Sequence, residues 1–202
     1  MLSELPINHY LDKVASGKPT PGGGSICALA AAAGAALAAM VAGLTIGRKQ
    51  YATVEPQIRA IQKHAGTLQS QLLNNVDRDA RAYGQVLEAF KLPRTTKTER
   101  TRRADAIQTA FKQAALVPLE VAEQALQVME LAEQVMAVGN PNAVTDGVVG
   151  TVMARSAAVG AIYNVRANLN AIDDNDFAQD CGRKADQLEI RVKQKVLDGV
   201  TS

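Results

Sequence analysis

Residues 19–51, PTPGGGSICALAAAAGAALAAMVAGLTIGRKQY, decide the fold of this chain. The prolines and glycines at the start disfavour regular structure, and Ser25 then offers a hydroxyl that can cap a helix start. No residue from 26 to 47 is charged and most are Ala or Gly, while Arg48 and Lys49 follow where cations stabilise the end of a helix dipole. We predict a helix over 26–47 that is apolar on every side and surrounded by other helices.

The same uncharged run is long enough to cross a bilayer, which takes about 20 apolar residues. It is poor in bulky Leu, Ile and Phe, however, and contains no aromatic residue that would mark a membrane interface. These features favour the central helix of a soluble protein over a membrane span, so we expect no membrane partner.

The glycine-rich segment before this helix has two interpretations, and the sequence leaves both open. The backbone N–H groups of Gly22, Gly23, Gly24 and Ser25 could point past a helix start and bind an anion or a carbonyl oxygen. Alternatively, the glycines form a tight turn that passes close to a neighbouring segment. A nucleotide-binding P-loop is excluded, because no Lys-Ser or Lys-Thr pair follows the glycines.

The composition predicts closely packed helices in one domain, residues 1–202. Hydrophobic residues make up 47% of the chain, aromatic residues only 3%, and Trp is absent. The net charge is +2, with bases concentrated in residues 91–112 and acids in residues 113–154. Since no aromatic residues are interleaved with the basic block, we interpret it as a solvated helix face and expect no nucleic-acid partner.

Cysteine and histidine usage provides no metal or disulfide pattern. Cys27 and Cys181 are too few for a disulfide framework, and His9 and His64 lie far apart without Cys or Glu at ligand spacing. The first residues also lack a basic segment followed by an apolar one, as a signal peptide would have. We therefore expect no metal and a cytoplasmic protein.

Apolar spacings of three and four residues predict further helices along the chain. The expected elements are a short helix over 3–15, a long helix over 55–92 ended by Pro93, a helix over 96–139 kinked or split by Pro118, and helices over 145–172 and 173–200. The apolar stripe of the 55–92 helix is expected to comprise Ile58, Ile61, Ala65, Leu68, Leu72 and Val76, and then Tyr83, Val86 and Phe90.

One position in that stripe carries a carboxylate where an apolar residue is expected. Asp79 lies between Val76 and Tyr83 on the stripe, whereas Asp77 is about 200° around the helix from Asp79. We therefore predict that Asp79 is buried and Asp77 is more exposed. Asp79 is then either a structural acid paired with Arg or Asn, or a carboxylate desolvated enough to serve as general acid or base.

Two other segments concentrate side-chain amides. Residues 140–146, NPNAVTD, read as a loop of caps and turns. On the helix that follows, Asn164 and Asn168 share a face with small residues, which indicates either a polar pocket between helices or two amides that satisfy loop carbonyls.

Several motifs occur in one order, and together they resemble a known family. They are PTPGGGS at 19–25, LTIGRKQY at 44–51, DRDARAY at 77–83, AFKLPRTT at 89–96, VPLEVA at 117–122, GNPNAVTD at 139–146 and NVRANL at 164–169. The set is similar to the formiminotransferase-cyclodeaminase C-terminal domain family, over about residues 2–177. Tyr83 stands where that family usually has Phe, and Thr145 where it usually has Ser.

The resemblance implies a bundle of long antiparallel helices that assembles as a homodimer. It implies a tetrahydrofolate substrate, in some members polyglutamylated, and no metal or redox cofactor. It also implies either hydrolysis of 5,10-methenyltetrahydrofolate to 10-formyltetrahydrofolate or closure of 5-formiminotetrahydrofolate with loss of ammonia, and the sequence does not decide between them. A non-catalytic folate-binding or scaffolding bundle is the alternative from another class.

The resemblance also implies which residues form the site. The family's catalytic Asp lies in its D-x-D-A motif, which maps to Asp77 and Asp79 here. Candidate substrate-binding residues are Gly22, Gly23, Gly24, Ser25, Arg48, Lys49, Asn140, Asn142, Asp146 and Asn164. Among them, the amides suit a pterin edge, and Arg48, Lys49 or the basic 91–103 block suits the glutamate tail.

Overall fold

The computed structural model describes residues 1–195, and every regular element in that part of the chain is helical, which confirms the all-α fold class. The elements in chain order are the 3-10 helix η1 (Leu2–Glu4), α1 (Ile7–Val14), α2 (Gly23–Gly43), η2 (Lys49–Tyr51), α3 (Glu55–Lys91), α4 (Lys97–Val138), η3 (Pro141–Ala143), α5 (Val144–Leu169) and α6 (Asn175–Gln194). The predicted extension of the last helix to residue 200 falls outside the described residues.

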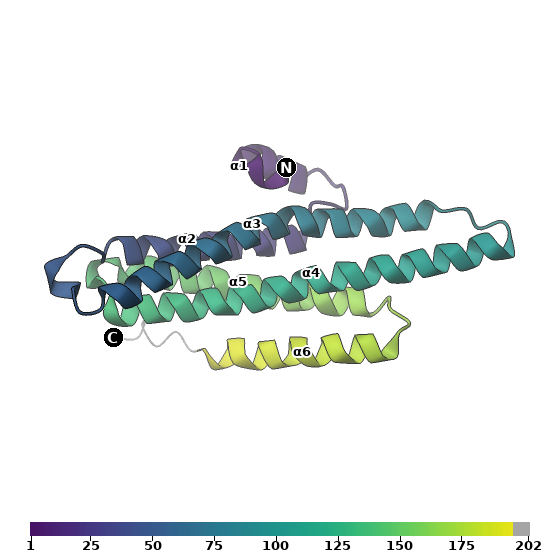
Figure 1. Ribbon diagram of the computed structural model, residues 1–202. Helices are drawn as coiled ribbons and strands as arrows, with labels where there is room; N and C mark the ends of the chain where they lie inside the picture. Colours follow the sequence, from purple (N-terminus) through teal and green to yellow (C-terminus); the bar gives the residue numbers. More distant parts are fainter. Residues whose placement is uncertain (196–202) are drawn as a thin grey trace.

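Four long helices run side by side along the molecule, and each is antiparallel to the next one in the chain (Figure 1). Helix α2 packs against α3, α4 and α5, as predicted for the central helix. Helix α6 packs against α4 and α5. Figure 1 shows that α1 lies apart from the long helices and that the α3–α4 hairpin extends beyond the remaining helices.

Helix α2 begins and ends earlier than predicted. It starts at Gly23 with Gly22 as its extended N-cap, so Ser25 lies inside the first turn and is not the cap. At the other end the helix stops at Gly43, and Gly47 adopts a φ of 78°, a left-handed conformation that favours glycine. Arg48 and Lys49 therefore lie beyond the helix and not in its last turn, contrary to the prediction.

The expectation that α2 is surrounded on every side is met only in part. The helix buries 11 of its 21 residues, among them Ala31, Ala35 and Ala38. An apolar stripe of α2 stays only partly covered, with Met40 exposed, and α5 exposes the side chains of Val149, Val152, Val159 and Tyr163. We call this surface the α2/α5 face.

Two helices could cross a membrane by length and composition alone, namely Gly23–Gly43 and Pro141–Leu169. Of their most apolar windows, 50% and 44% lie buried inside the bundle, and the core helix of a soluble protein meets the same criterion.

The first half of the α3 stripe is confirmed, because every predicted residue from Ile58 to Val76 is buried. The second half is wrong at Tyr83 and Phe90, which are exposed. Beyond about residue 80 the buried side chains of α3 are Ala82, Val86 and Ala89, which cluster with residues of α4. The stripe changes direction because in the protruding hairpin α4 becomes the main neighbour of α3.

Helix α4 runs unbroken from Lys97 to Val138, so of the two predicted effects of Pro118, a kink or a split, the split is wrong. Thr96 caps its start, since its hydroxyl accepts a hydrogen bond from Glu99 N and the Glu99 carboxylate accepts one from Thr96 N. Helix α4 tolerates Pro118 because another group satisfies the carbonyl that the missing N–H leaves free, as described below.

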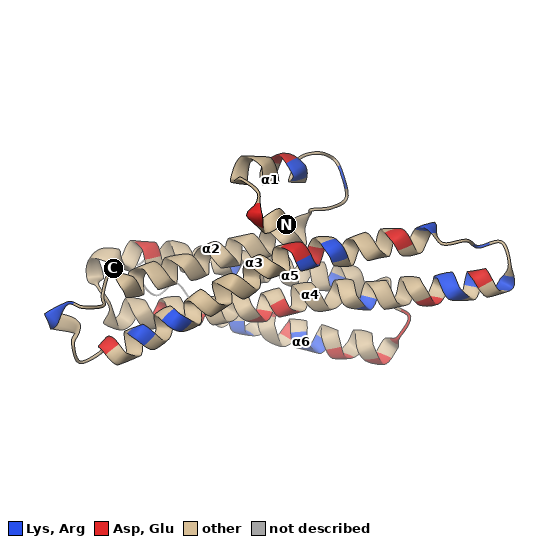
Figure 2. Ribbon diagram, turned by 45° about the horizontal axis from the view of Figure 1, so that its top comes forward, with Lys and Arg blue, Asp and Glu red and all other residues tan. Residues whose placement is uncertain are grey.

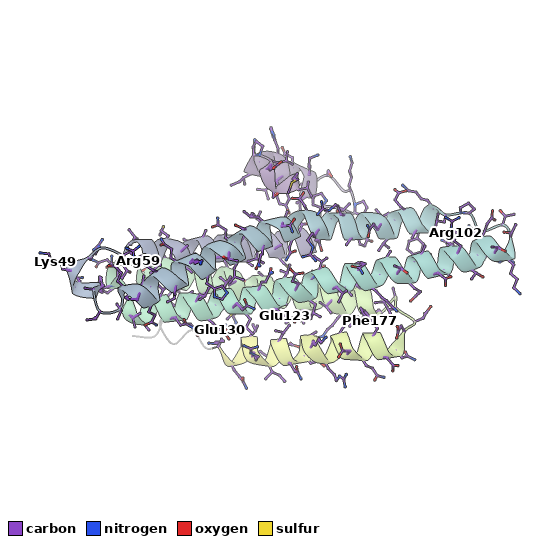
Figure 3. The ribbon with its side chains drawn as sticks, in the orientation of Figure 1. Lys49, Arg59, Arg102, Glu123, Glu130 and Phe177 are labelled. Carbon is purple, nitrogen blue, oxygen red and sulfur yellow. The ribbon has the colours of Figure 1, made fainter. Side chains whose placement is uncertain are left out.

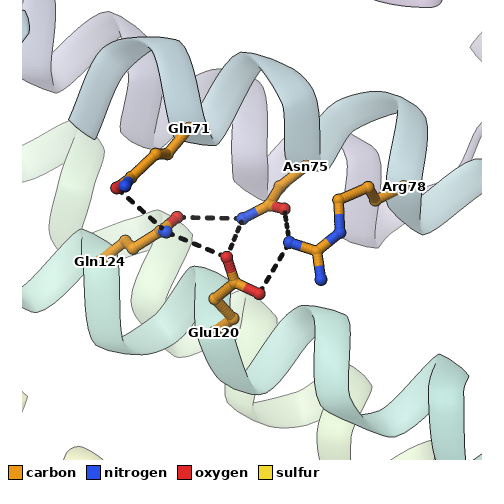
Figure 4. Close-up of polar contacts among 5 residues, drawn as sticks. All are labelled: Gln71, Asn75, Arg78, Glu120 and Gln124. Atoms are coloured by element: carbon orange, nitrogen blue, oxygen red, sulfur yellow. Dashed lines mark hydrogen bonds and ion pairs between the residues drawn. The ribbon is translucent and has the colours of Figure 1, made fainter. Parts of the chain in front are cut away.

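A network of five polar side chains joins α3 to α4 (Figure 4). Asn75 is fully buried and donates from Nδ2 to Gln124 Oε1 at 3.0 Å and to Glu120 Oε1 at 3.3 Å. Arg78 Nη1 donates to Asn75 Oδ1 at 2.6 Å and to Glu120 Oε2 at 2.7 Å. Gln124 also donates to Glu120 and Gln71. Because both polar atoms of Asn75 are paired, the network holds the two helices in one register beside the acidic motif.

Helices α2 and α5 approach each other at backbone contact. A Cβ atom on Gly34 would lie 2.7 Å from the Gly150 carbonyl oxygen, and one on Gly150 would lie 3.1 Å from the Gly34 carbonyl oxygen. Any side chain at either position would push the two backbones apart.

We therefore expect Gly34→Ala to lower the free energy of unfolding by about 1–3 kcal/mol, because it overpacks a contact between two backbones. Gly66→Ala on α3 is the matched control. No atom lies within 4 Å of a Cβ there, so the higher helix propensity of Ala should stabilise the protein by up to about 1 kcal/mol. Urea unfolding of both variants tests this, and equal stability changes would contradict the close contact.

Candidate active site

A pocket of about 180 Å³ opens at the amino end of α2, where four helices meet. Its wall comprises Pro19, Thr20, Gly22, Gly23 and Gly24 before and at the start of α2, Asp79 and Tyr83 from α3, Ala114 from α4, and Asn164, Ala167 and Asn168 from α5. Asp79 is the only charged side chain among these residues. The pocket thus combines one carboxylate with helix-start N–H groups and side-chain amides.

Asp79 lies against the first turn of α2. Ser25 Oγ donates to Asp79 Oδ2 at 3.0 Å, and a Cβ on Gly24 would lie only 2.0 Å from Asp79 Oδ1. Position 24 therefore has to be glycine for the carboxylate to occupy this site. The close approach to a neighbouring segment is thus confirmed at Gly24, although within a helix and not in a turn, and the helix-start N–H groups lie at the pocket, where ligand binding by them stays a prediction.

Burial raises the pKa of Asp79 above its ordinary value, and the hydrogen bonds from the Ser25 side chain and backbone offset this only in part. No Lys, Arg or His side chain lines the pocket to favour the charged form. Asp79 is therefore suited to take up and release a proton closer to neutral pH than an exposed Asp would.

Asp77 points away from Asp79, as helix geometry predicts, but the prediction that it is the more exposed acid is wrong. Its side chain is 6% exposed because η1 covers it. Its Oδ1 accepts from Leu2 N at 2.6 Å, and its Oδ2 accepts from Ser3 Oγ at 2.6 Å and Ser3 N at 3.3 Å. Burial alone would raise the pKa of Asp77, but these hydrogen bonds together hold it below its ordinary value. Asp77 docks the N-terminal segment and does not line the pocket.

The amides of α5 line the predicted polar pocket, and they also satisfy carbonyls, although these belong to helices α4 and α5 and not to loops as predicted. Asn164 Nδ2 donates to Gly160 O at 2.8 Å, and Asn168 Nδ2 donates to Ala114 O at 2.8 Å and to Asn164 O at 3.0 Å. These bonds orient both side-chain oxygens away from the carbonyls. Within residues 1–195 neither oxygen accepts a hydrogen bond from the protein, so both are available to a ligand.

Pro118 explains the bond between Asn168 and Ala114. In a regular helix the Ala114 carbonyl would accept from the N–H of residue 118, which proline lacks. Asn168 supplies the missing donor from the neighbouring helix. Asn168 is a pocket residue that the sequence analysis did not select as a site residue, and the proline within a helical pattern was the signal that could have indicated it.

Five of the predicted binding residues lie at the other end of α2. Its 21 residues, at about 1.5 Å each, place that end roughly 30 Å from Asp79. Figure 3 shows Lys49 at this end of the molecule. The residues concerned are Arg48, Lys49, Asn140, Asn142 and Asp146, and one chain does not bring them to the pocket.

Asn140 has a structural role at that end. Its backbone N–H donates to Thr45 Oγ1 at 3.0 Å, its Nδ2 donates to Leu44 O at 3.4 Å, and its Oδ1 accepts from Asn142 N at 3.1 Å. It thereby ties the loop before α5 to the segment after α2. In the part of the chain that is described, no group of three or more His, Cys, Asp and Glu side chains is placed to hold a metal ion.

Comparison with known proteins provides relatives over nearly the whole chain. Residues 6–187 match the family model described as formiminotransferase-cyclodeaminase. The chain is 38% identical over 180 residues to the methenyltetrahydrofolate cyclohydrolase of Methylorubrum extorquens, covering 89% of this chain and 86% of that one. It is 36% identical over 178 residues to the formimidoyltransferase-cyclodeaminase of Mus musculus, of which it spans only 33%.

A solved structure has the same fold. The crystal structure of the formiminotetrahydrofolate cyclodeaminase from Thermotoga maritima superposes with a TM-score of 0.87 at 27% identity, and the match covers 100% of both chains. Helix number and arrangement are therefore shared over the entire bundle.

We expect the Pro118–Asn168 pair to behave as a coupled unit. Asn168→Leu should lower the free energy of unfolding by about 1–3 kcal/mol, because it leaves the buried Ala114 carbonyl unpaired. In a Pro118→Ala background the cost should fall by about 1 kcal/mol, since the alanine introduced there can donate its own N–H. Chemical unfolding of the four proteins in this double-mutant cycle measures the coupling, and additive effects would contradict it.

Proposed function

The chain belongs to the formiminotransferase-cyclodeaminase family, and from this we propose that it is a folate one-carbon enzyme in which residues 1–202 act as one helical domain. The reaction we favour is hydrolysis of 5,10-methenyltetrahydrofolate to 10-formyltetrahydrofolate, because the Methylorubrum relative with that name is the more similar of the relatives compared above. The observation that carries the proposal is a single proton-accepting carboxylate, Asp79, in an otherwise uncharged pocket.

The substrate's methenyl bridge is a cation shared by N5, the bridge carbon and N10, and a carboxylate stabilises such a charge. A water molecule attacks the bridge carbon and gives one proton to Asp79, which produces a neutral carbinolamine. The bond between the bridge carbon and N5 then breaks, Asp79 returns its proton to N5, and the carbinol proton leaves as the formyl C=O forms. One water is consumed and one proton is released, so Asp79 serves as base and then as acid.

The remaining pocket groups suit the pterin ring. Gly23 and Gly24 are in the first turn of α2, where N–H groups lack helical acceptors and can donate to a carbonyl oxygen. The free side-chain oxygens of Asn164 and Asn168 can accept from pterin N–H groups. These transfers need no redox cofactor or metal, in line with the sequence expectation.

A pocket of about 180 Å³ has room for the pterin and the bridge but not for the benzoylglutamate tail, which must lie outside it. The nearest concentration of positive charge along α3 and α4 is the tip of their hairpin, with Arg94, Lys97, Arg100, Arg102 and Arg103 (Figure 2). We propose that this tip attracts a polyglutamylated tail in the cytoplasm. Figure 3 shows Arg102 at the end of the molecule opposite Lys49.

The second candidate is closure of 5-formiminotetrahydrofolate with release of ammonia, favoured by the Thermotoga maritima cyclodeaminase structure that matches over its full length. Here N10 attacks the formimino carbon, and the protonated form of Asp79 would supply the proton with which ammonia leaves. Turnover of the methenyl and formimino substrates, assayed side by side, separates the two activities. A non-catalytic folate-binding bundle would turn over neither.

We further propose a homodimer through the α2/α5 face. That face exposes Val149, Val152, Val159 and Tyr163 beside the apolar stripe of α2, and Figure 2 shows few charged residues on α2 and α5. A second copy would surround α2 as its apolar composition requires. In a two-fold, antiparallel pair the Arg48 end of one α2 would lie beside the pocket of the other copy, where its predicted role applies.

For catalysis we expect Asp79→Asn to lower kcat by about 10²-fold or more with the fold intact, because the amide keeps the shape and cannot take up a proton. Asp77→Asn should cost less in kcat, since this residue binds η1 and is absent from the pocket. Steady-state turnover of 5,10-methenyltetrahydrofolate, with circular dichroism as the folding control, compares them. Parent-like turnover by Asp79→Asn would refute the assignment.

For assembly we expect sedimentation at twice the 21.4 kDa chain mass. Val152→Glu should convert the dimer to monomer at micromolar concentration, because it places a charge in the apolar contact. The matched control is Ile190→Glu, which replaces an exposed apolar residue on α6 and should leave the dimer unchanged. A parent protein that sediments as a monomer would refute the proposal.

A further inference from the structure

Helix α1 contributes one fully buried residue to the bundle core. It stands apart from the long helices in both Figure 1 and Figure 2, and Tyr10 is its only buried side chain, 3% exposed. Ile7 and Leu11 on the same helix are exposed. The contact between α1 and the bundle core is therefore made by the Tyr10 ring and, at the end of the helix, by the partly buried Val14.

The hydroxyl of Tyr10 is not explained by this packing. Among residues 1–195 it is the only buried side-chain nitrogen or oxygen without a hydrogen-bond partner. An unpaired buried hydroxyl is unfavourable, and a Phe would fill the same apolar space without that cost. We therefore expect a group close to this hydroxyl that could form a hydrogen bond with it.

Those surroundings are the inner side of the candidate active site. Burial raises the pKa of Tyr10 to about 12, Ser25 acts on it as a hydrogen-bonding neighbour, and Asp79, Asp77 and Cys27 are near enough to add to the shift. The hydroxyl is thus neutral at physiological pH and keeps a proton to donate. Ser25 is close enough to influence this hydroxyl, although no hydrogen bond joins the two side chains in the structure.

Ser25 has one hydroxyl proton and two acceptors. Its Oγ lies 3.0 Å from Val76 O and 3.0 Å from Asp79 Oδ2, so it can donate to only one of them at a time. The oxygen of this hydroxyl retains lone pairs that accept a hydrogen bond. A donor on the far side of Ser25 would complete a chain that ends at the carboxylate.

We propose that Tyr10 is a positioning residue for Asp79, with its hydroxyl donating to Ser25 Oγ and thereby strengthening the Ser25 hydrogen bond to the carboxylate. The chain Tyr10–Ser25–Asp79 serves both protonation states. With Asp79 ionised, Ser25 donates to it. With Asp79 protonated, Asp79 donates to Ser25 Oγ and Ser25 donates to Val76 O, so each proton finds an acceptor.

The N-terminal segment is held in place for this role by the other acid of the motif. Asp77 accepts three hydrogen bonds from Leu2 and Ser3, a few residues before α1. The two acids of the D-x-D-A motif would then act on one site, since Asp77 docks the segment that brings Tyr10 to Ser25 and Asp79 faces the pocket.

The direction in which the Tyr10 hydroxyl shifts the pKa of Asp79 follows from the charge on each group. Donation by Tyr10 favours the ionised form of Asp79, so loss of the hydroxyl should raise the pKa of Asp79 further. The other titratable groups near Asp79 are Cys27 on α2 and Tyr83 on α3, whereas Asp77 points away from it. Helices α4 and α5 present only uncharged residues to the pocket. Burial also raises the pKa of Cys27, to about 11, so this thiol stays neutral over the range of interest.

The test is the titration of Asp79 in the free protein, followed by NMR of ¹³C-labelled carboxyl groups in the parent and in Tyr10→Phe. We expect the pKa of Asp79 to rise by about 0.5–1 unit, the size expected for loss of one hydrogen bond. Tyr51→Phe, on η2 at the far end of the bundle, is the matched control and should cause no shift. In a Ser25→Ala background, Tyr10→Phe should cause no shift either, because the link is already missing.

A second variant, expected to lower the pKa of Asp79, tests whether the shift in Tyr10→Phe comes only from loosening of α1. Introducing 3-fluorotyrosine at position 10 makes the hydroxyl a stronger donor, so the pKa of Asp79 should fall. An unchanged Asp79 titration in Tyr10→Phe, or the same shift with and without Ser25, would overturn the proposal.

The role in turnover rests on the proposed function. There, the pH profile of kcat for 5,10-methenyltetrahydrofolate should move to higher pH by the same amount in Tyr10→Phe, whereas a structural defect would lower kcat equally at all pH values. A shift of Asp79 in NMR without any folate turnover by the parent protein would refute the proposed function and leave the hydrogen-bond chain established.

Discussion

The structure depends on the lack of side-chain volume along α2. A helix of Ala and Gly lets α5 approach to backbone contact at Gly34 and Gly150, and it lets α3 and α4 close around the same axis. Small residues bury little apolar area each, so the bundle gains its stability from the number and closeness of such contacts. The same composition leaves one stripe of α2 only partly covered, and this is the basis of the proposed dimer through the α2/α5 face.

The pocket lies at the start of this thin helix, where three departures from regular helix structure occur close together. Gly24 has no side chain, so the Asp79 carboxylate lies against the helix start. Pro118 has no N–H, so a carbonyl of α4 recruits Asn168 from α5. The first turn of α2 has N–H groups without helical acceptors. Each irregularity would weaken a helix in isolation, and together they place polar groups around one small space.

The two acids of the DRDA segment illustrate how environment separates identical side chains. Asp77 is covered by η1 and surrounded by donors, so its pKa is low and it stays ionised as a structural anchor. Asp79 is half-buried with a single serine partner, and desolvation raises its pKa. Because they are two residues apart on one helix, the two acids point to different neighbours, and those neighbours decide which acid exchanges a proton at higher pH.

The sequence by itself determined the helical class, the central position of the Ala-rich helix, the apolar stripe from Ile58 to Val76 and the opposite directions of Asp77 and Asp79. All of these follow from composition and from the 3.6-residue period, which are local properties of the chain. Only the tertiary structure decided that η1 covers Asp77, that Tyr10 is buried in the bundle core, and that Arg48 and Asn140 lie at the far end of α2 from the pocket. These depend on which segments meet across the bundle, and helix periodicity carries no information about the contacts that a distant segment makes.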